Sequence, residues 1–326
     1  MKNQIIAEAL KYNIPYHLFF NEAEAFCKWL FVGDGDFKEP FFENTIRLER
    51  YKPVNIHPQQ CISEINMITA WAQHVESCAP SAVIFHVSRC GSTLATQLLG
   101  EDPENIVLSE VPFFDELIQW KTKTAPNDEA GLPELLKAAI TFYTAKRTPA
   151  QKRSFIKTDS WHIFFYPLYR KLFPTTPFIF LYRRPDEVIR SHQKKRGMHM
   201  VPGLLPPEIF GFTSTDILTI PFDEYPAKVL EKYFEHFLHI TKTDPLAYPI
   251  NYSEGGMAMV EKIATVAGFT ITGDLREVMN NRMGFHAKNP GEVFSEEGVK
   301  WESAGSMEKV MGLYGEMGET AKENLL

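Results

Sequence analysis

The sequence predicts an α/β protein with a parallel β-sheet that is flanked by helices on both faces. Short runs that are apolar throughout, such as AVIFHV at 82–87 and PFIFLY at 177–182, alternate with stretches of helical character. Strands without a polar face belong to sheets that are covered on both sides. In addition, Gly91 and Pro185 closely follow two of these runs, where glycine suits a turn and proline a first helical position.

The predicted elements follow one another regularly from residue 81 to about residue 267. We expect strands at 82–87, 106–108, 154–157, 177–182 and 247–252, and helices at 92–99, 112–120, 161–172, 224–240, 254–267 and from 185 onward. In such a sheet, ligands bind outside the carboxyl ends of the strands. The residues to examine therefore follow the strands directly: Ser88–Thr93, Ser109–Glu110, Thr158–Asp159, Arg183–Arg184 and Asn251–Tyr252.

The first 80 residues have a different character and lack this alternation. An amphipathic stretch at 23–31 and a second run at 62–76 predict helices, and Pro80 is a plausible boundary. We therefore expect two parts: a mainly helical N-terminal extension at 1–80 that packs on the main domain, and an α/β domain at 81–326.

Composition and charge exclude several classes of protein. A chain of 326 residues with 44% hydrophobic residues can bury a large core. The net charge of −7 argues against a general nucleic-acid binder. The four cysteines show no metal-binding spacing, so no metal is expected. The N-terminus has no signal-peptide pattern, and the apolar runs are far shorter than the roughly 20 residues that span a bilayer. We expect a cytoplasmic protein without a membrane span.

The segment Ser81–Leu99 predicts a strand, a loop and a helix that together bind an anion. The loop reads Ser88-Arg89-Cys90-Gly91-Ser92-Thr93. A turn of this kind directs backbone N–H groups and the positive end of a helix at one point, and Arg89 adds a cationic fork. The nucleotide-triphosphatase loop GxxxxGK[ST] differs, because Ser92 stands where its lysine follows the glycine. The loop therefore gives little support to an enzyme that hydrolyses ATP or GTP.

This loop resembles the 5'-phosphosulfate loop of the sulfotransferase family, which runs roughly Pro-Lys-Ser-Gly-Thr-Thr. Arg89 stands where that family has Lys or Arg. Ser88 in place of proline and Leu94 in place of a frequent tryptophan are departures from the family pattern. The resemblance implies that 3'-phosphoadenosine 5'-phosphosulfate is the co-substrate. Its binding residues in this loop would be Arg89, Cys90, Gly91, Ser92 and Thr93, and Arg89 would also assist catalysis.

A second basic element follows the strand at 177–182. The segment from Tyr182 to Ser191 is similar to the 3'-phosphate signature of the same family, in which an arginine and a serine bind the phosphate. Arg183 and Ser191 fall on those two positions. Their spacing of eight residues is slightly more than two helical turns, so both can face one cleft. The following Lys194-Lys195-Arg196 is more typical of a solvated helix face.

The resemblance extends more loosely to the C-terminal part of the chain and covers residues 81 to about 301. Tyr252 falls on the residue that contacts the adenine in the family, although a buried aromatic at a strand end is an equally good interpretation. The family closes over the 3'-phosphate with a loop rich in Lys, Arg and Gly. Lys288 is a candidate for that contact here, and Lys300 is a weaker one.

The sequence offers three candidates for the base that accepts the acceptor's proton. Many family members have Lys-Thr-His after the third strand, but this chain has Lys157-Thr158-Asp159. We rank Glu110 first as the base, because bacterial and carbohydrate-acting relatives often have a catalytic glutamate there. Asp159 is second, although it could equally be a helix N-cap. His162 is third, since it could face the cleft from the first helical turn.

The leading interpretation is an enzyme that transfers a sulfuryl group to a hydroxyl or amine of a small-molecule or carbohydrate acceptor. One alternative is a P-loop kinase acting on a small molecule, which would need the missing lysine and an aspartate for magnesium. Another is a binding protein for 3'-phosphoadenosine nucleotides that has lost its base. The sequence selects neither the acceptor nor the oligomeric state.

Overall fold

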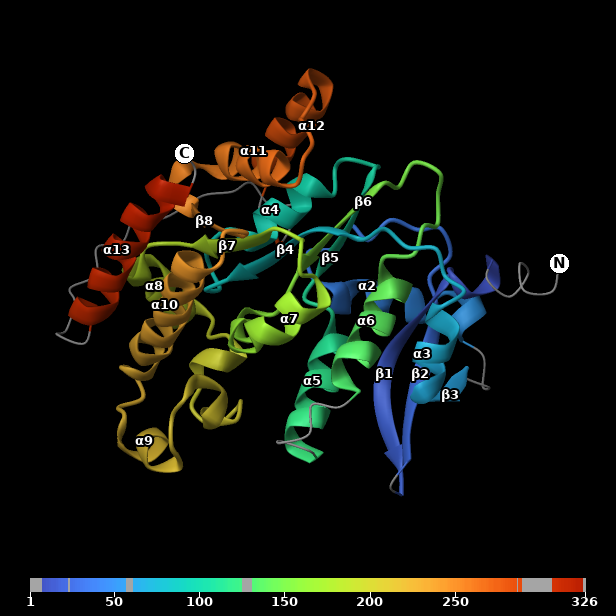
Figure 1. Ribbon diagram of the computed structural model, residues 1–326, viewed down its shortest axis with the longest axis horizontal. Coiled ribbons are helices and arrows are strands. Elements are labelled where there is room, and N and C mark those ends of the chain that lie inside the picture. Colours follow the sequence, from blue (N-terminus) through green and yellow to red (C-terminus); the bar gives the residue numbers. More distant parts are fainter. Residues whose placement is uncertain are drawn as a thin grey trace. The chain divides into compact units, whose positions relative to one another are not determined.

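The computed structural model describes residues 8–22, 24–56, 61–124, 131–285, 287–288 and 307–324. Five strands form a sheet in the order β5-β6-β4-β7-β8. This order differs from the order along the chain, as expected when crossover connections join parallel strands. The pairs β5–β6, β4–β7 and β7–β8 are all parallel, and helices flank the sheet (Figure 1). The predicted α/β class is therefore confirmed.

The strands of this sheet lie where the apolar runs predicted them. They are β4 (Pro80–His86), β5 (Asn105–Ser109), β6 (Arg153–Lys157), β7 (Phe178–Tyr182) and β8 (Ala247–Asn251). Every residue of β5 and β7 is buried, which explains why these strands have no polar face. Ser109 pairs with Lys157 in the parallel register, so β5 and β6 end side by side.

Most helices begin within two residues of their predicted starts. These are α4 (Ser92–Leu99), α5 (Pro112–Thr124), α8 (Pro185–Lys194), α10 (Tyr225–Thr243) and α11 (Gly256–Val266). The helix expected at 161–172 is instead a 3₁₀ helix, η2 (Ser160–Phe165), followed by α7 (Tyr166–Leu172). The helices outside the predicted elements include α6 (Leu132–Tyr143), α9 (Ser214–Thr219), α12 (Gly273–Met283) and α13 (Glu308–Asn324). Short 3₁₀ turns are η1 (Pro53–Asn55), η3 (Met198–Met200), η4 (Pro207–Phe210) and η5 (Tyr252–Glu254).

The prediction of a mainly helical N-terminal region is wrong. β1 (Asn13–Asn21) and β2 (Glu24–Phe31) form an antiparallel hairpin, and β3 (Ile62–Glu64) pairs with the other edge of β2. The helices of this region include the short α2 (Phe42–Arg50) and α3 (Asn66–Ala72). Aromatic side chains favour the strands, because Phe19 and Phe26 stack across the hairpin with ring centroids 5.7 Å apart.

The chain divides into two compact units. The first contains Met1–Ser81, Thr96–Lys157 and Leu168–Pro174, and the second contains Ala82–Ala95, Thr158–Pro167 and Thr175–Leu326. In the first unit, α5 and α6 pack on β1, and α3 packs on α6. In the second unit, α10 packs against α13, and both helices contact β8, as does α11 (Figure 1). None of the helices in the described ranges is both long and apolar enough to cross a membrane.

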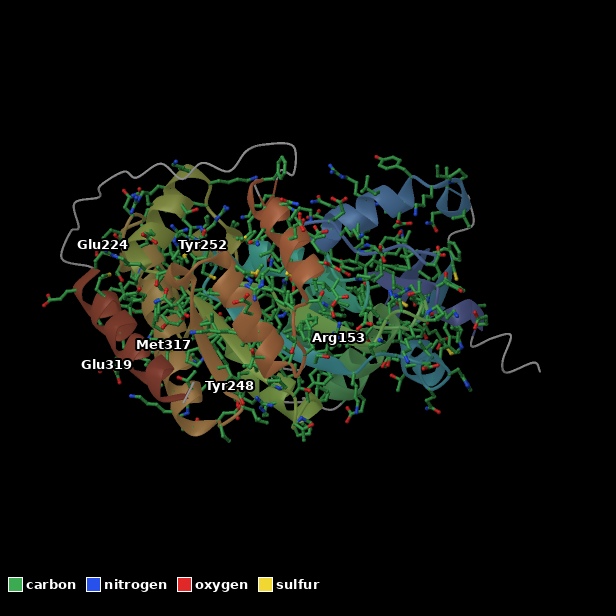
Figure 2. All side chains as sticks on the ribbon, turned by 90° about the horizontal axis from the view of Figure 1, so that it is seen from above. Arg153, Glu224, Tyr248, Tyr252, Met317 and Glu319 are labelled. Atoms are coloured by element: carbon green, nitrogen blue, oxygen red, sulfur yellow. The ribbon has the colours of Figure 1, made fainter. Side chains whose placement is uncertain are left out.

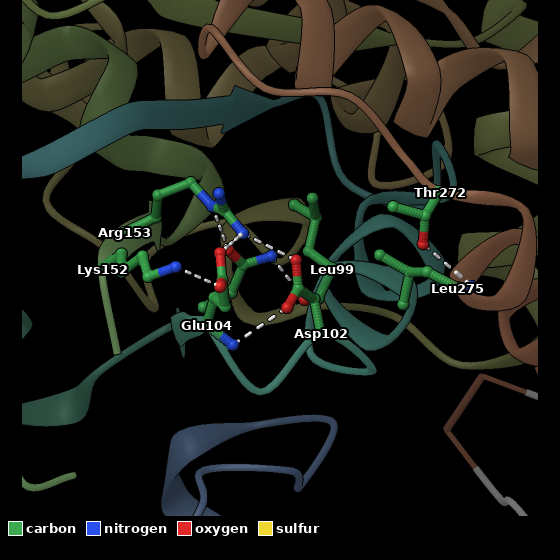
Figure 3. A network of polar contacts seen from close by, with 8 residues as sticks. Leu99, Asp102, Glu104, Lys152, Arg153, Thr272 and Leu275 are labelled. Atoms are coloured by element: carbon green, nitrogen blue, oxygen red, sulfur yellow. Dashed lines mark hydrogen bonds and ion pairs between the residues drawn. The ribbon is translucent and has the colours of Figure 1, made fainter. Parts of the chain in front are cut away.

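A network of hydrogen bonds and ion pairs in the first unit connects the end of α4 with the first residues of β5 and β6 (Figure 3). The Arg153 guanidinium donates to Asn105 Oδ1 and to Asp102 Oδ2, each at 2.7 Å, and lies 3.0 Å from Glu104 Oε2. The Asn105 amide in turn donates to the carbonyl oxygen of Leu99 at the end of α4, at 2.9 Å. Only 19% of the Arg153 side chain is exposed, so solvent replaces these bonds poorly when they are lost.

We expect Arg153→Met to lower the free energy of unfolding by about 2 kcal/mol, because it leaves partly buried acceptors without their charged donor. Lys152→Met is the matched control. Lys152 also pairs with Glu104, but 61% of its side chain is exposed. Its loss should therefore cost about 0.5 kcal/mol or less. Urea unfolding of the full chain measures both values, and equal losses in the two variants would contradict this ranking.

Candidate functional site

The loop after β4 has an unusual backbone. Ser88, Arg89 and Gly91 have positive φ values of 66°, 51° and 77°, and α4 begins directly afterwards at Ser92. Left-handed conformations cost a residue other than glycine roughly 1–2 kcal/mol, so the surrounding structure must hold this loop in place. Turns of this kind present successive backbone N–H groups to an anion. The backbone thus has the form that the predicted phosphate loop requires.

His86 contributes to holding the loop. The N–H of Ser88 donates to Nδ1 of His86 at 3.1 Å, and Nε2 of the same ring lies 3.1 Å from the carbonyl oxygen of Thr158. Since Nδ1 accepts, the neutral ring carries its proton on Nε2 and donates it to Thr158. His86 is only 3% exposed. A buried neutral imidazole therefore ties the start of the loop to the segment after β6.

Three side chains of the predicted phosphate loop are buried, but they lie in different places. Ser92 and Thr93 are buried at the first turn of α4, where the backbone N–H of Ala95 closes the first helical bond to Gly91. The Cys90 thiol is fully buried and donates to the carbonyl oxygen of Leu181 at 3.3 Å. It therefore packs into the sheet, which leaves only the backbone of Cys90 as a candidate anion ligand.

Tyr252 lies directly against the phosphate loop. A Cβ atom added to Gly91 would lie 2.2 Å from Cδ2 of Tyr252, so the ring occupies the space that a side chain would need. The Arg183 guanidinium lies over the same ring, with Cζ 4.6 Å from the ring centroid. Tyr252 follows the end of β8, away from Tyr248 near its start (Figure 2). One aromatic ring thus touches two of the predicted phosphate-binding residues.

The second basic element lies at the end of β7 and on α8. Arg183 Nε donates to Glu187 Oε2 at 2.6 Å, which fixes the guanidinium beside the start of α8. Ser191 lies on the same helix and is partly buried. Arg196 stacks on Phe222 with Cζ 3.9 Å from the ring centroid and pairs with Asp223, whereas Lys194 and Lys195 are exposed. The solvated interpretation therefore fits the two lysines but not Arg196.

Lys288 is described by the structure and is partly buried. Its positive charge contributes to lowering the pKa of His192 on α8, so it lies in the neighbourhood of the second basic element. Lys300, the weaker candidate, lies outside the described residues.

The first unit contains Glu110, the leading candidate base. It has a positive φ of 54°, and its N–H donates to the carbonyl oxygen of Lys157 at 2.9 Å. The carboxylate lies 2.7 Å from Nζ of Lys157, whose side chain is fully buried. Asp115 is partly buried, and desolvation together with the charges of Glu110 and Glu116 raises its pKa well above the ordinary value. Glu110 thus combines a left-handed backbone, of the kind that clusters at functional sites, with a carboxylate held by a buried ammonium.

Asp159 and His162 lie in the second unit. Asp159 occupies the N-cap position of η2, but its side chain accepts no capping hydrogen bond. Ser160 Oγ donates to Asp159 Oδ1 at 3.4 Å. His162 is only 1% exposed and meets Trp161 edge to face, with ring centroids 4.4 Å apart. This burial does not fit the expectation that His162 faces a cleft, and Glu110 and Asp159 are the more accessible candidates.

Two parts of this arrangement were not predicted from the sequence. Lys157 was visible in the Lys-Thr-Asp stretch, but its pairing with Glu110 depends on the register of β5 and β6. His192 and His199 were also missed. They form a buried pair whose rings meet at 90° with centroids 5.3 Å apart. A histidine directly after Ser191 was the only signal in the sequence.

No protein-family model matches this sequence, and no curated protein matches it. Three of the solved structures that are similar to parts of the chain are sulfotransferases. One from Mycobacterium avium has a TM-score of 0.48 and 14% identity, and covers 78% of this chain and 81% of its own. One from Mycobacterium tuberculosis has a TM-score of 0.40, 14% identity and coverages of 64% and 72%. One from Alicyclobacillus acidocaldarius has a TM-score of 0.37, 13% identity and coverages of 63% and 91%.

Proposed function

We propose that this protein transfers a sulfuryl group from 3'-phosphoadenosine 5'-phosphosulfate to a hydroxyl or amine of a small-molecule or carbohydrate acceptor. The observation that carries the proposal is the contact of Tyr252 with both Gly91 and Arg183. It joins the loop suited to a 5'-phosphosulfate with the arginine suited to a 3'-phosphate. A nucleotide with phosphates at both positions matches two cationic elements that share one aromatic ring.

In the proposed reaction, the acceptor oxygen or nitrogen attacks sulfur while the bond from sulfur to the bridging phosphate oxygen breaks. Adenosine 3',5'-bisphosphate leaves, and negative charge develops on its 5'-phosphate. Arg89, the backbone of residues 89–93 and the hydroxyls of Ser92 and Thr93 would stabilise that charge. Such transfers depend mainly on positioning and charge stabilisation. The scheme requires no metal.

The 3'-phosphate of the co-substrate would bind Arg183 and Ser191, with Lys288 as a further cation. Tyr252 would contact the adenosine from the side of the phosphate loop. The ion pair between Arg183 and Glu187 supports this role, because it orients the guanidinium before the nucleotide arrives. A guanidinium fork that is already oriented loses less entropy on binding a phosphate.

The acceptor's proton would pass to a carboxylate, and we propose Glu110 for this role, with Asp159 as the second candidate. Two observations support the choice of Glu110: it directly follows β5 with a left-handed backbone, and its carboxylate is held 2.7 Å from Nζ of Lys157. Base catalysis of this kind typically contributes about 10²–10⁴ to a rate.

Thermal unfolding with different nucleotides tests the proposal. We expect adenosine 3',5'-bisphosphate to raise the melting temperature, since a ligand at 100 times its Kd stabilises a protein by about 2.7 kcal/mol. Adenosine 5'-monophosphate, which lacks the 3'-phosphate, should stabilise less at the same concentration. Stabilisation by ATP with magnesium but not by the bisphosphate would contradict the proposal and favour a kinase.

A further inference from the structure

The phosphate-loop arginine is anchored to a turn that no part of the proposed reaction uses. Arg89 Nη2 donates to the carbonyl oxygen of Lys195 at 2.7 Å, from the loop after β4 to the residue after α8. Both residues belong to the second unit. A guanidinium on a long flexible side chain has many rotamers, and a fixed carbonyl selects among them. The orientation of Arg89 therefore depends on whatever fixes the carbonyl of Lys195.

The turn that contains this carbonyl, residues 195–199, is held by His192. The backbone N–H of Gly197 donates to Nδ1 of His192 at 3.1 Å. This bond requires a neutral ring with its proton on Nε2. Burial and the charges of His199, Arg89, Lys288 and Arg196 lower the pKa of His192 to about 2. The acceptor at Nδ1 is therefore present throughout the range from about pH 5 to about pH 9.

A second imidazole closes the turn from the other side. A Cβ atom added to Gly197 would lie 2.8 Å from Cε1 of His199 and 3.2 Å from Cε1 of His192, so this glycine is packed between the two rings. His199 is in turn anchored, because its Nδ1 lies 3.3 Å from Ser160 Oγ, which accepts a hydrogen bond from the Tyr233 hydroxyl at 3.2 Å. His192, His199 and Ser160 are all buried. The turn is thus fixed on both sides by residues of the core.

We propose that His192 is a positioning residue for Arg89: by holding Gly197, it fixes the carbonyl of Lys195 that orients the guanidinium in the phosphate loop. The effect of this device on sulfuryl transfer depends on the proposed function, but the anchoring itself does not. His192 acts through the turn and needs no contact with the nucleotide. Its role therefore differs from the phosphate-binding role proposed for Arg183 and for Ser191, the residue directly before it.

Three variants of the full chain separate this role from general stability. His192→Leu removes the acceptor for Gly197, whereas His192→Asn keeps an oxygen near the place of Nδ1. His239→Leu is the control, since His239 is an exposed histidine on α10. The probes are adenosine 3',5'-bisphosphate and adenosine 3'-monophosphate, and calorimetry measures their affinities. The second probe lacks the 5'-phosphate that Arg89 would bind.

We expect His192→Leu to weaken bisphosphate binding about tenfold, the effect of one lost charged hydrogen bond, and to leave 3'-monophosphate binding unchanged. His192→Asn and His239→Leu should bind both probes like the natural protein. In an Arg89→Ala background, His192→Leu should have no further effect, because its target is gone. Additive losses in the double variant, or equal weakening of both probes, would overturn the proposal.

A measurement without nucleotide keeps the inference independent of the proposed function. NMR of protein labelled with ¹⁵N in its arginine guanidinium groups should show restricted rotation for Arg89, with the signal assigned by its loss in Arg89→Lys. That restriction should disappear in His192→Leu and persist in His192→Asn. If the natural protein binds neither probe, the proposed function fails, and these spectra alone decide the inference. Free rotation of the Arg89 guanidinium in the natural protein would overturn the inference.

Discussion

Replacing Gly91 by alanine is expected to lower the affinity for adenosine 3',5'-bisphosphate roughly a hundredfold, about 2.7 kcal/mol. The new Cβ would lie 2.2 Å from Cδ2 and 2.4 Å from Cε2 of Tyr252, far inside van der Waals contact. Either the loop or the ring must move, and both belong to the proposed nucleotide site. Arg183 lies over the same ring, so a displaced Tyr252 would also disturb the proposed 3'-phosphate contact. Calorimetric titration of the two proteins measures the loss.

A control variant separates the effect of the clash with Tyr252 from the effect of the positive φ. Gly268 has a φ of +78°, against +77° at Gly91, but a Cβ added there meets nothing within 4 Å. Gly268→Ala therefore carries the same left-handed strain without the clash, and it should lower stability by about 1 kcal/mol while binding the bisphosphate normally. In ligand-free melting, Gly91→Ala combined with Tyr252→Ala should be more stable than Gly91→Ala alone. Normal bisphosphate binding by Gly91→Ala would refute the role given to this contact.

Local pattern was enough to predict the parallel sheet and the helix starts next to it. β7 is buried along its whole length, and Pro185 begins the helix that follows it, so one short segment of sequence contains the necessary information. β2 shows the opposite case. Its burial does not alternate, so it carries no period-2 signal. Its conformation depends on pairing with β1 and β3, and the second of these partners lies more than 30 residues away in the sequence.

The candidate site also combines local motifs with contacts between residues that are distant in sequence. The strand, loop and helix at 81–99 and the place of Arg183 after β7 were predictable, because each is a short motif at the end of a strand. That these residues bind phosphate stays a prediction. The contact of Gly91 with Tyr252 joins residues 161 positions apart, and the bond from Arg89 to Lys195 joins residues 106 apart. Such contacts follow from strand order and helix packing. Residue types alone could indicate that Tyr252 was a candidate, but not that its ring would lie against the glycine of the loop.

Glu110→Ala is expected to destabilise the protein by about 3–5 kcal/mol, much more than the loss of Lys157. The reason is an asymmetry in burial: none of the Lys157 side chain is exposed, but 22% of the Glu110 side chain is. Removing the carboxylate leaves an ammonium in the core, where the ring of Phe41, 5.2 Å from Nζ, replaces little of the ion pair. Removing the lysine leaves a carboxylate that water can reach. Lys157→Met should therefore cost only about 1 kcal/mol.

The double variant tests this explanation. Glu110→Ala combined with Lys157→Met should be about as stable as Lys157→Met alone, because the buried charge is gone and a side chain of similar length fills its place. Chemical denaturation of the four proteins at pH 7 gives the complete cycle. If Glu110→Ala and the double variant are equally destabilised, the buried ammonium is not the source of the loss.

The same cycle decides how the base can be identified. Loss of turnover in Glu110→Ala alone would be ambiguous, since partial unfolding abolishes activity as effectively as a missing base. In the Lys157→Met background, the carboxylate can be removed without that penalty. Release of sulfate from 3'-phosphoadenosine 5'-phosphosulfate, with water as the acceptor, provides a readout that needs no known acceptor. If Glu110 is the base, the double variant should be about 10²–10⁴ slower than Lys157→Met. Equal rates would exclude Glu110 and leave Asp159 as the carboxylate to test, because His162 is buried against Trp161.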